Sequence, residues 1–458
     1  MLIITAPGQG AQTPGFLAPW LELPGVAERL GAASELAGCD LIGFGTTASA
    51  DEIRDTAVAQ PLLVAAAIVA ASALAESAAA GSAAAGSAAA GSAAAGGVPA
   101  DAAAGHSVGE LAAGVIAGVL AADDALRLVG VRGRAMAAAA AVEPTGMTAV
   151  LGGDQDAVLA AIAQCGLTPA NVNGAGQIVA AGTLANLEAF AAAPPAGARL
   201  RPLQVAGAFH TRHMAPAVAA LRDAAAGLTV ADPAMTLLSN SDGAAVTTGK
   251  EWLERIVAQV AAPVRWDLCM RTMADLGVTA LIELPPAGTL TGLARRALPG
   301  VAQLAIKTPD QLGAARDLIA EHLTEHLADP DGHGHGHLPE WRLIVAPTSG
   351  TFRSGGPGRD GGAGSPPVIG GIPGGRPPGA STAPPDLLCT VVARGGERAV
   401  RAPWPAEIIE WLVEDGDPVS EGQPLVRVQP EGGPGGWAPP GSEGGPGGWA
   451  PPGRREGA

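Results

Sequence analysis

The pentapeptide Gly105-His106-Ser107-Val108-Gly109 lies between a short apolar run at 102–104 and a helix-like segment at 110–120. This order is typical of a nucleophile elbow, in which a serine occupies a sharp turn between a strand and a helix. The glycines matter because such a turn leaves no room for Cβ atoms beside the serine. The turn exposes the serine oxygen to the amides that begin the new helix, so Ser107 is a candidate nucleophile. A chance glycine-rich turn is the alternative, since the chain contains 66 glycines.

Short apolar runs alternate with Ala- and Leu-rich segments over residues 1–328. The predicted strands are Met147–Leu151, Gln177–Ala181, Leu200–Val205, Met235–Ser239 and Ala280–Leu284. The predicted helices are Ala57–Leu74, Asp123–Ala140, Asp156–Cys165, Met214–Ala226, Lys250–Val260 and Trp266–Leu276. This alternation predicts an α/β fold with a largely parallel sheet. Residues 1–6 have no basic region and predict a first buried strand rather than a signal peptide.

The net charge and the cysteines indicate which partners and which cellular compartment are expected for this protein. A net charge of -16 argues against a nucleic-acid partner, which normally requires a basic face. The four cysteines lie far apart and include no Cys-x-x-Cys, which favours reduced thiols in a cytoplasmic protein. The apolar stretch Pro61–Leu74 is too short and too rich in alanine for a membrane span, so no membrane association is expected.

Composition also marks the boundaries of the units. Residues 76–97 repeat Ala-Ala-Ala-Gly-Ser, a period that fits neither a helix nor a strand face, and predict a solvent-exposed insertion without a catalytic role. A Gly/His-rich linker occupies 329–340. Its histidines, with His322 and His326, could hold a transition metal adventitiously, but a flexible connector is the favoured interpretation, so no metal site is predicted. Residues 430–458 form a Gly/Pro-rich tail whose composition predicts disorder.

A serine nucleophile needs a base, and the histidines leave few choices. Five of the eight lie at or beyond position 322, and His106 is the neighbour of the serine. His210 directly follows an apolar predicted strand, the position at which an α/β sheet presents site residues. His213 falls on the next predicted helix and is interpreted as a surface or capping residue.

From Met1 to about residue 328 the chain resembles the malonyl-CoA:acyl-carrier-protein transacylases of fatty acid synthesis. Seven segments match that family's motifs in the family's order: Ala6–Gln12, Gly105–Glu110, Val131–Met136, Asn173–Gln177, Ala208–His210, Gln259–Trp266 and Glu283–Gly292. The resemblance implies an α/β-hydrolase-like large subdomain and a smaller ferredoxin-like subdomain at roughly 140–204, with the site between them.

The resemblance also implies the roles of five residues. Ser107 would attack the thioester of malonyl-CoA, and His210 would take its proton and return it to the leaving thiol. The backbone carbonyl of Gln259 would orient the imidazole in place of a carboxylate. The backbone amides of Gln9 and Val108 would form the oxyanion hole.

Four further residues would form or border the binding site of the acyl group. The guanidinium of Arg132 can hold the malonyl carboxylate with two parallel hydrogen bonds, which favours malonyl-CoA over acetyl-CoA. A solvated helix arginine is the alternative for Arg132. Phe209, with Val108, resembles the malonyl-type signature and would crowd a methyl branch. Met136 would line the same pocket, and Asn173 would be a structural hydrogen-bonding residue near the site.

The second half of the reaction would transfer malonyl to the phosphopantetheine thiol of holo-acyl carrier protein. Such carriers are acidic, so docking needs a local basic patch, for which Arg265, Arg295, Arg296 and Lys307 are candidates. A discrete polyketide-synthase acyltransferase and a serine ester hydrolase are the competing enzymatic interpretations. A non-catalytic adaptor is a third, against which the intact Ser107, His210 and Arg132 argue.

Residues 341–429 resemble a degenerate, β-rich biotinyl/lipoyl carrier domain. Such a carrier needs a lysine at its hairpin tip, where this chain has Ala393-Arg394-Gly395-Gly396, with Gly395 in the lysine position. No lysine follows Lys307, so neither biotin nor lipoate attachment is expected, and no cofactor is predicted. The domain is interpreted either as a decayed spacer or as a docking module for a biotin-dependent acyl-CoA carboxylase.

Overall fold

A computed structural model of the chain describes residues 1–84, 97–328, 342–353, 381–382, 387–393, 396–401, 406–411, 413, 415–419 and 424–430. The predicted linker at 329–340 lies outside the described residues, as does most of the Ala/Gly/Ser insertion. The predicted tail at 430–458 also lies outside them, except for its first residue, Pro430.

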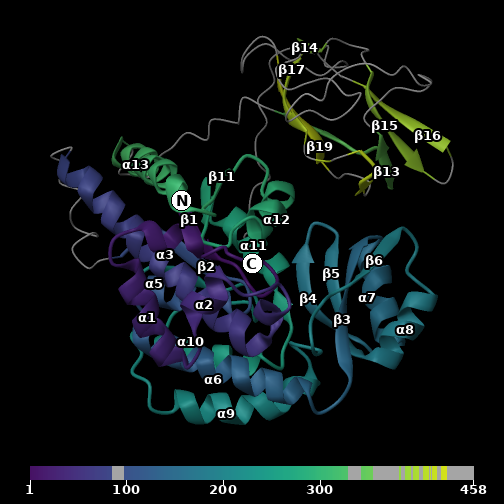
Figure 1. Cartoon of the computed structure of the whole chain (residues 1–458). Helices are drawn as coiled ribbons and strands as arrows, with labels where there is room; N and C mark the ends of the chain where they lie inside the picture. Colours follow the sequence, from purple (N-terminus) through teal and green to yellow (C-terminus); the bar gives the residue numbers. More distant parts are fainter. Residues whose placement is uncertain are drawn as a thin grey trace, which may run out of the picture.

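The larger sheet has six strands in the order β11-β10-β1-β2-β7-β8 (Figure 1). These strands are β1 (Leu2–Ala6), β2 (Ala102–Gly105), β7 (Thr236–Leu238), β8 (Ala245–Val246), β10 (Ala280–Glu283) and β11 (Ala302–Ala305). All neighbouring strands are parallel except β7 and β8. The predictions of a mixed α/β fold and of a first buried strand are confirmed.

Alternate residues of β1 enter two separate cores, because side chains along a strand point to opposite faces. Leu2 and Ile4 pack in a core that includes residues of α3 (Thr56–Ala84), α5 (Gly109–Ile116), α6 (Ala122–Ala140) and α13 (Leu312–Ala328). Ile3 packs with residues of α11 (Trp266–Asp275) and α12 (Thr289–Ala297) on the other face. The parallel strands are thus covered on both faces, which explains why the short sequences of β1 and β2 are entirely apolar or small.

Helix α3 is longer than the sequence indicated. The residues Thr56–Ala79 are long enough and apolar enough to cross a membrane, and 78% of the apolar window is buried within the protein. The expectation that this stretch is too short is wrong, because the alanine repeat continues the helix to Ala84. Alanine has the highest helix propensity, which outweighs the interspersed Gly and Ser over the first repeat.

Of the six remaining helices in the described residues, three match predicted helices and three were not predicted. They are α1 (Val26–Ala37), α2 (Leu41–Thr46), α7 (Gln155–Gln164), α8 (Leu184–Ala192), α9 (Ala215–Ala225) and α10 (Gly249–Gln259), with short 3-10 turns η1 (Ala18–Glu22), η2 (Glu52–Arg54), η3 (Arg212–Met214) and η4 (Pro309–Gln311). The six predicted helices match α3, α6, α7, α9, α10 and α11 to within two residues, except at the C-terminal end of α3.

A second, smaller sheet has the strand order β6-β3-β5-β4-β9. It consists of β3 (Thr145–Gly152), β4 (Thr168–Gly174), β5 (Gln177–Thr183), β6 (Ala198–Pro202) and β9 (Val264–Arg265). The first four strands fall within the predicted subdomain at 140–204. Strand β9 comes from outside that range and pairs in parallel with β4, so it ties the smaller sheet to the start of α11.

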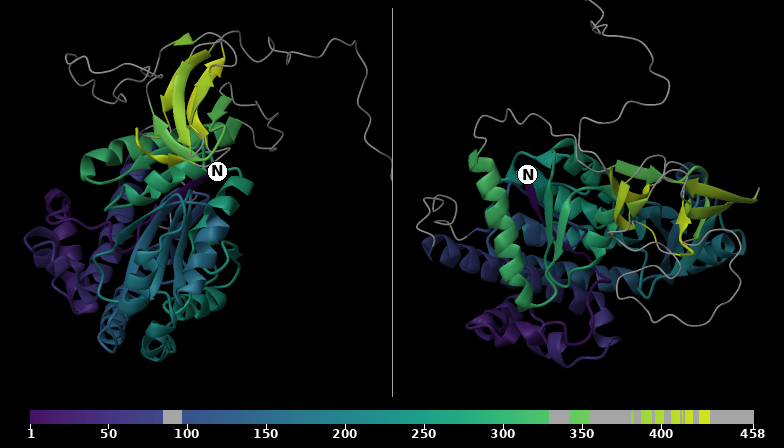
Figure 2. Two further views of the ribbon diagram at one scale, coloured as in Figure 1. Left: turned by 90° about the vertical axis from the view of Figure 1, so that its right-hand side faces the viewer. Right: turned by 90° about the horizontal axis from the view of Figure 1, so that it is seen from above.

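The described C-terminal residues form two four-stranded antiparallel sheets, β12-β19-β17-β14 and β16-β15-β13-β18 (Figures 1 and 2). The strands are β12 (Arg342–Val345), β13 (Gly350–Arg353), β14 (Ser381–Thr382), β15 (Leu387–Ala393), β16 (Gly396–Arg401), β17 (Ala406–Trp411), β18 (Pro418–Val419) and β19 (Pro424–Pro430). Phe352, Val391 and Leu425 are buried in a core of their own. Residues 394 and 395 at the tip of the β15–β16 hairpin, the predicted lysine position, lie outside the described residues.

Candidate active site

The predicted elbow is a sharp turn between β2 and α5. Ser107 has a φ of 53°, a left-handed conformation that is unusual for a residue other than glycine. A Cβ at Gly105 would collide with the backbone of Gly109, and one at Gly109 would collide with the carbonyl of Ala6. The two glycines are therefore required by the turn, and chance is excluded as the reason for their spacing.

Ser107, His210 and Gln259 form a continuous chain of hydrogen bonds. Ser107 Oγ lies 2.7 Å from His210 Nε2, and His210 Nδ1 lies 3.0 Å from the backbone oxygen of Gln259. A carbonyl oxygen only accepts, so Nδ1 carries the proton and Nε2 presents its lone pair to the serine hydroxyl. This arrangement makes His210 a base for Ser107.

Burial keeps that base neutral. His210 is 4% exposed, and its pKa is lowered to about 3 by loss of solvation and by the nearby charge of Arg132. A neutral imidazole can accept the proton of the serine throughout the physiological pH range.

His210 reaches the site by a different route from the one the sequence indicated. Strand β6 ends at Pro202 and belongs to the smaller sheet, so His210 does not directly follow a strand of the larger one. It occupies a turn with a φ of 60°, and its amide donates to the carbonyl of Val260 (3.1 Å). The strand predicted at Leu200–Val205 ends at Pro202, because Leu203 and Val205 line a cavity instead of extending it. His213 lies in η3 and pairs with Glu143, as expected of a residue near the surface.

Arg132 projects from α6 toward the nucleophile and is only 1% exposed. Its guanidinium donates to Gln60 Oε1 (2.6 Å), to Gln259 Oε1 (3.3 Å) and to Ser107 Oγ (3.4 Å). Burial lowers its pKa to about 10, so it stays cationic at neutral pH. The alternative of a solvated helix arginine is wrong, because such a residue would point away from the core. A buried cation beside a nucleophile suits an anionic substrate group.

A cavity of about 70 Å³ opens above the serine. Its walls carry Gln9, Gln60, His106, Ser107, Met136, Met147, Asn171, Val179, Leu203, Val205, Phe209 and His210. The predicted contacts Met136 and Phe209 are among them. Asn173 instead lies against His106, with its Oδ1 2.9 Å from His106 Nε2 and its Nδ2 donating to Gln177.

Of the two predicted oxyanion donors, Gln9 lines this cavity and Val108 directly follows Ser107. Val108 precedes the first turn of α5, and Gln9 lines the cavity, with its side chain donating to Thr56 Oγ1 (3.2 Å). Among the hydrogen bonds of the described residues, neither backbone amide donates to a protein acceptor. Both amides are therefore available to a substrate oxygen.

Comparison with known proteins decides the family. A family model described as an acyl transferase domain matches residues 7–308. The chain belongs to the acyl transferase family. A malonyl CoA-acyl carrier protein transacylase of Mycobacterium tuberculosis is 52% identical over 318 residues, which are 69% of this chain and 100% of that protein.

Solved structures agree with this assignment to the acyl transferase family. The crystal structure of MCAT from Mycobacterium tuberculosis superposes with a TM-score of 0.63 at 52% identity, over 69% of this chain and 99% of that one. A type II PKS acyl-carrier protein in complex with its malonyl-transacylase includes a chain that matches with a TM-score of 0.61 at 28% identity, over 69% of this chain and 99% of that one.

Sequence reasoning missed two polar residues that line the cavity of this acyl transferase site. Gln60 binds Arg132, and the Oδ1 atom of Asn171 is buried at the cavity without a hydrogen-bond partner in the described residues. Gln60 carries a signal that could have been used, since it is a polar residue inside an apolar helix. Asn171 carries none, because a single amide within a strand has no spacing that reports a cavity.

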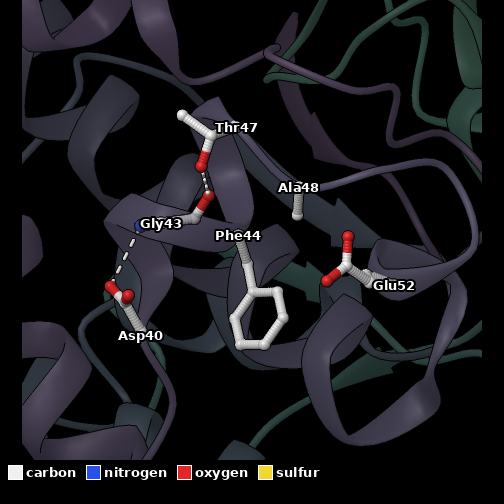
Figure 3. Close-up of a pocket in the computed structure, with 6 residues that line it drawn as sticks. All are labelled: Asp40, Gly43, Phe44, Thr47, Ala48 and Glu52. Carbon is white, nitrogen blue, oxygen red and sulfur yellow. Dashed lines mark hydrogen bonds between the residues drawn. The ribbon is translucent and has the colours of Figure 1, made fainter.

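A second hollow, which shares no residue with the cavity above Ser107, lies around α2 (Figure 3). Its lining residues are Asp40, Gly43, Phe44, Thr47, Ala48 and Glu52. The Asp40 carboxylate accepts from the amide of Gly43 (2.9 Å), so it caps the short helix. Among the described residues no group of three metal-ligating side chains occurs, and His322 pairs with Asp101 at 2.7 Å.

Proposed function

We propose that this protein transfers malonyl from malonyl-CoA to the phosphopantetheine thiol of an acyl carrier protein in fatty acid biosynthesis, through a malonyl ester of Ser107. The observation that carries the proposal is the Ser107–His210–Gln259 hydrogen-bond chain with the buried cation of Arg132 beside it. The relatives in the acyl transferase family support the same reaction.

In the first half-reaction His210 Nε2 takes the proton of Ser107 as the serine oxygen attacks the thioester carbon. The oxyanion that forms is held by the amides of Gln9 and Val108. The tetrahedral intermediate then expels the thiolate of coenzyme A, which receives the proton from His210. A thiolate is a good leaving group, so a backbone carbonyl suffices to orient the base.

Arg132 selects the acyl group. Its guanidinium can turn from Ser107 and Gln259 toward the malonyl carboxylate and bind both oxygens. Acetyl-CoA offers no anion to this buried cation and is a poor substrate. Met136 and Phe209 fill the cavity wall and disfavour a methyl branch, and Asn173 keeps His106 in place beside the serine.

In the second half-reaction His210 takes the proton of the holo-acyl carrier protein thiol as the sulfur attacks the malonyl ester. The tetrahedral intermediate then expels Ser107 Oγ, which receives that proton from His210. The exposed Arg295, Arg296 and Lys307 are the proposed docking cations for an acidic carrier. Arg265 is a weaker candidate, because it is paired with Asp267 (2.8 Å). The solved complex of a relative with its acyl-carrier protein supports a partner of this kind.

The test of the full reaction is a chase experiment. The enzyme is loaded with malonyl-CoA, freed of excess donor and mixed with holo-acyl carrier protein, and both proteins are weighed by mass spectrometry. We expect malonyl to leave the enzyme and appear on the holo-carrier, with the apo-carrier as a matched control that gains nothing. Release of free malonate at the same rate with or without the carrier would favour the ester hydrolase instead. Carriers of fatty acid and polyketide synthesis compared side by side would separate those two uses.

The fold supports a finer description of the units. The order β3-α7-β4-β5-α8-β6 is that of a ferredoxin-like βαββαβ unit, and we propose that it is inserted into an α/β-hydrolase-like large subdomain. The paired four-stranded sheets at 342–430 suit a degenerate biotinyl/lipoyl-like domain without its acceptor lysine. We also propose a cytoplasmic location, in keeping with four unpaired cysteines.

The C-terminal domain is proposed as a spacer, with docking to a biotin-dependent acyl-CoA carboxylase as the second candidate. We expect a chain that ends at Ala328 to keep the kcat and KM of the full chain, because Ser107, His210, Arg132 and the cavity lie before that residue. Affinity capture with the full chain and the shortened chain in parallel tests docking. Recovery of a biotinylated subunit by the full chain alone would support the second candidate, and equal recovery would exclude it.

A further inference from the structure

Behind the cavity lies a buried carboxyl group to which the proposed mechanism gives no part. Glu110, in the first turn of α5, is 2% exposed. Its Oε1 accepts from the backbone amide of Asn240 (2.9 Å), and its Oε2 accepts from the side-chain nitrogen of Gln259. The two donors come from the segments after β7 and at the end of α10, so one carboxyl group joins three distant parts of the chain.

The first donor leads to the nucleophile. Asn240 is fully buried, and its side chain holds both sides of the elbow. Its Oδ1 accepts from the amide of Ser107 (2.7 Å), and its Nδ2 donates to the carbonyl of Gly105 (2.8 Å). These bonds oppose relaxation of the left-handed backbone at Ser107, a conformation that persists only where its surroundings enforce it.

The second donor leads to the base and to the cation. The backbone oxygen of Gln259 orients His210, and the side-chain oxygen of the same residue accepts from Arg132. Because Glu110 holds the side-chain nitrogen of Gln259, the side-chain oxygen of Gln259 is directed toward the guanidinium of Arg132.

We propose that Glu110 is the positioning residue of this site, holding nucleophile and base in register through Asn240 and Gln259. Glu110 does not touch substrate and acts only through these two neighbours. The inference rests on the proposed roles of Ser107 and His210.

The substitution Glu110→Gln tests the proposal. It keeps the shape of the side chain but replaces the oxygen that accepts from Gln259 with an NH₂ group, which would face the NH₂ group of Gln259. Loss of register by a fraction of an ångström is expected to lower kcat about 10- to 100-fold. The KM for malonyl-CoA should stay within about threefold, since Arg132 remains. Acylation of Ser107 by p-nitrophenyl acetate, a neutral ester that needs no cation, should fall by the same factor. Glu254→Gln, the same change at an exposed position of α10, is the matched control.

The double variant E110Q/Q259E restores the hydrogen bond between positions 110 and 259 with donor and acceptor exchanged. The amide introduced at position 110 would donate to the carboxylate introduced at position 259, whose other oxygen would still accept from Arg132. We expect each single variant to be impaired and the double variant to recover most of the lost kcat. Losses that simply multiply in the double variant would overturn the proposal, as would a Glu110→Gln enzyme with full kcat or with a change in KM alone.

Thermal unfolding of each variant separates misfolding from misalignment. If Glu110→Gln does not fold, Asn240→Asp provides the second test. This variant keeps the oxygen that accepts from the Ser107 amide and replaces the nitrogen that donates to Gly105 with a second oxygen. It should lower both kcat with malonyl-CoA and the rate of acylation by p-nitrophenyl acetate. Wild-type rates in this variant would overturn the proposal. Failure of the wild-type enzyme to take malonyl would instead contradict the proposed function, whereas the p-nitrophenyl acetate comparison would still test Glu110.

Discussion

Ser107→Ala is expected to abolish the malonyl-sized mass gain that the wild-type chain shows after brief incubation with malonyl-CoA. The transfer rate should fall by about 10⁴- to 10⁶-fold, the range seen when a catalytic serine is removed. The reason is covalent: without Oγ the thioester has no attacking atom, although the amides of Gln9 and Val108 and the base remain in place. Intact-mass spectrometry measures the acyl-enzyme directly, and a carrier assay measures the rate.

Two controls make this result specific. Ser72→Ala removes a hydroxyl that bonds only within α3, to the carbonyl of Ile68 (3.0 Å), and should acylate as the wild type does. The fold of Ser107→Ala should be intact, since the change removes one hydroxyl worth about 1 kcal/mol of unfolding free energy. A malonyl adduct on the Ser107→Ala chain would place the nucleophile elsewhere and contradict the mechanism.

The elbow and its partners differ in how far the sequence determines them. Ser107 could be predicted because the turn itself demands glycines at 105 and 109, and this demand is local. His210 could be proposed by elimination among eight histidines, yet its position in a turn outside the larger sheet could not, since a run of apolar residues looks the same in a strand and in a cavity wall.

Two residues that sequence reasoning missed, Asn240 and Gln60, have partners that are distant in the sequence. Asn240 binds Ser107 across 133 positions of sequence, and Gln60 binds Arg132 across 72. A single amide in a sequence has no periodicity or spacing that reports a partner so far away, and only the packing of α3 against α6 and of β7 beside β2 brings these groups together. Strand β9 of the smaller sheet could not be predicted either, because its two residues are too short a run to form a recognisable pattern.

Arg132→Ala is expected to remove the preference for malonyl-CoA. Leaving one partner of a buried ion pair without the other costs about 3–5 kcal/mol, so kcat/KM for malonyl-CoA should fall roughly 100- to 5,000-fold. The kcat/KM for acetyl-CoA should stay at the wild-type value or rise, because Arg132→Ala leaves no buried cation without an anionic partner when acetyl-CoA binds. Initial rates with both donors measure the ratio, and Arg127→Ala, an exposed arginine on the same helix paired with Asp124, is the matched control.

Arg132→Lys distinguishes charge from geometry. A lysine keeps the cation and loses the planar pair of donors that a carboxylate and Gln60 both use, so its malonyl preference should lie between those of the wild type and Arg132→Ala. An equal fall in kcat/KM for malonyl-CoA and acetyl-CoA in Arg132→Ala would mean that Arg132 supports the serine rather than the substrate. Its 3.4 Å contact with Ser107 Oγ also allows that role. Unchanged rates with both donors would remove the cation from the mechanism and leave an ester hydrolase as the better description. The ratio of the two donors, rather than the rate with either one, therefore decides what this buried arginine does.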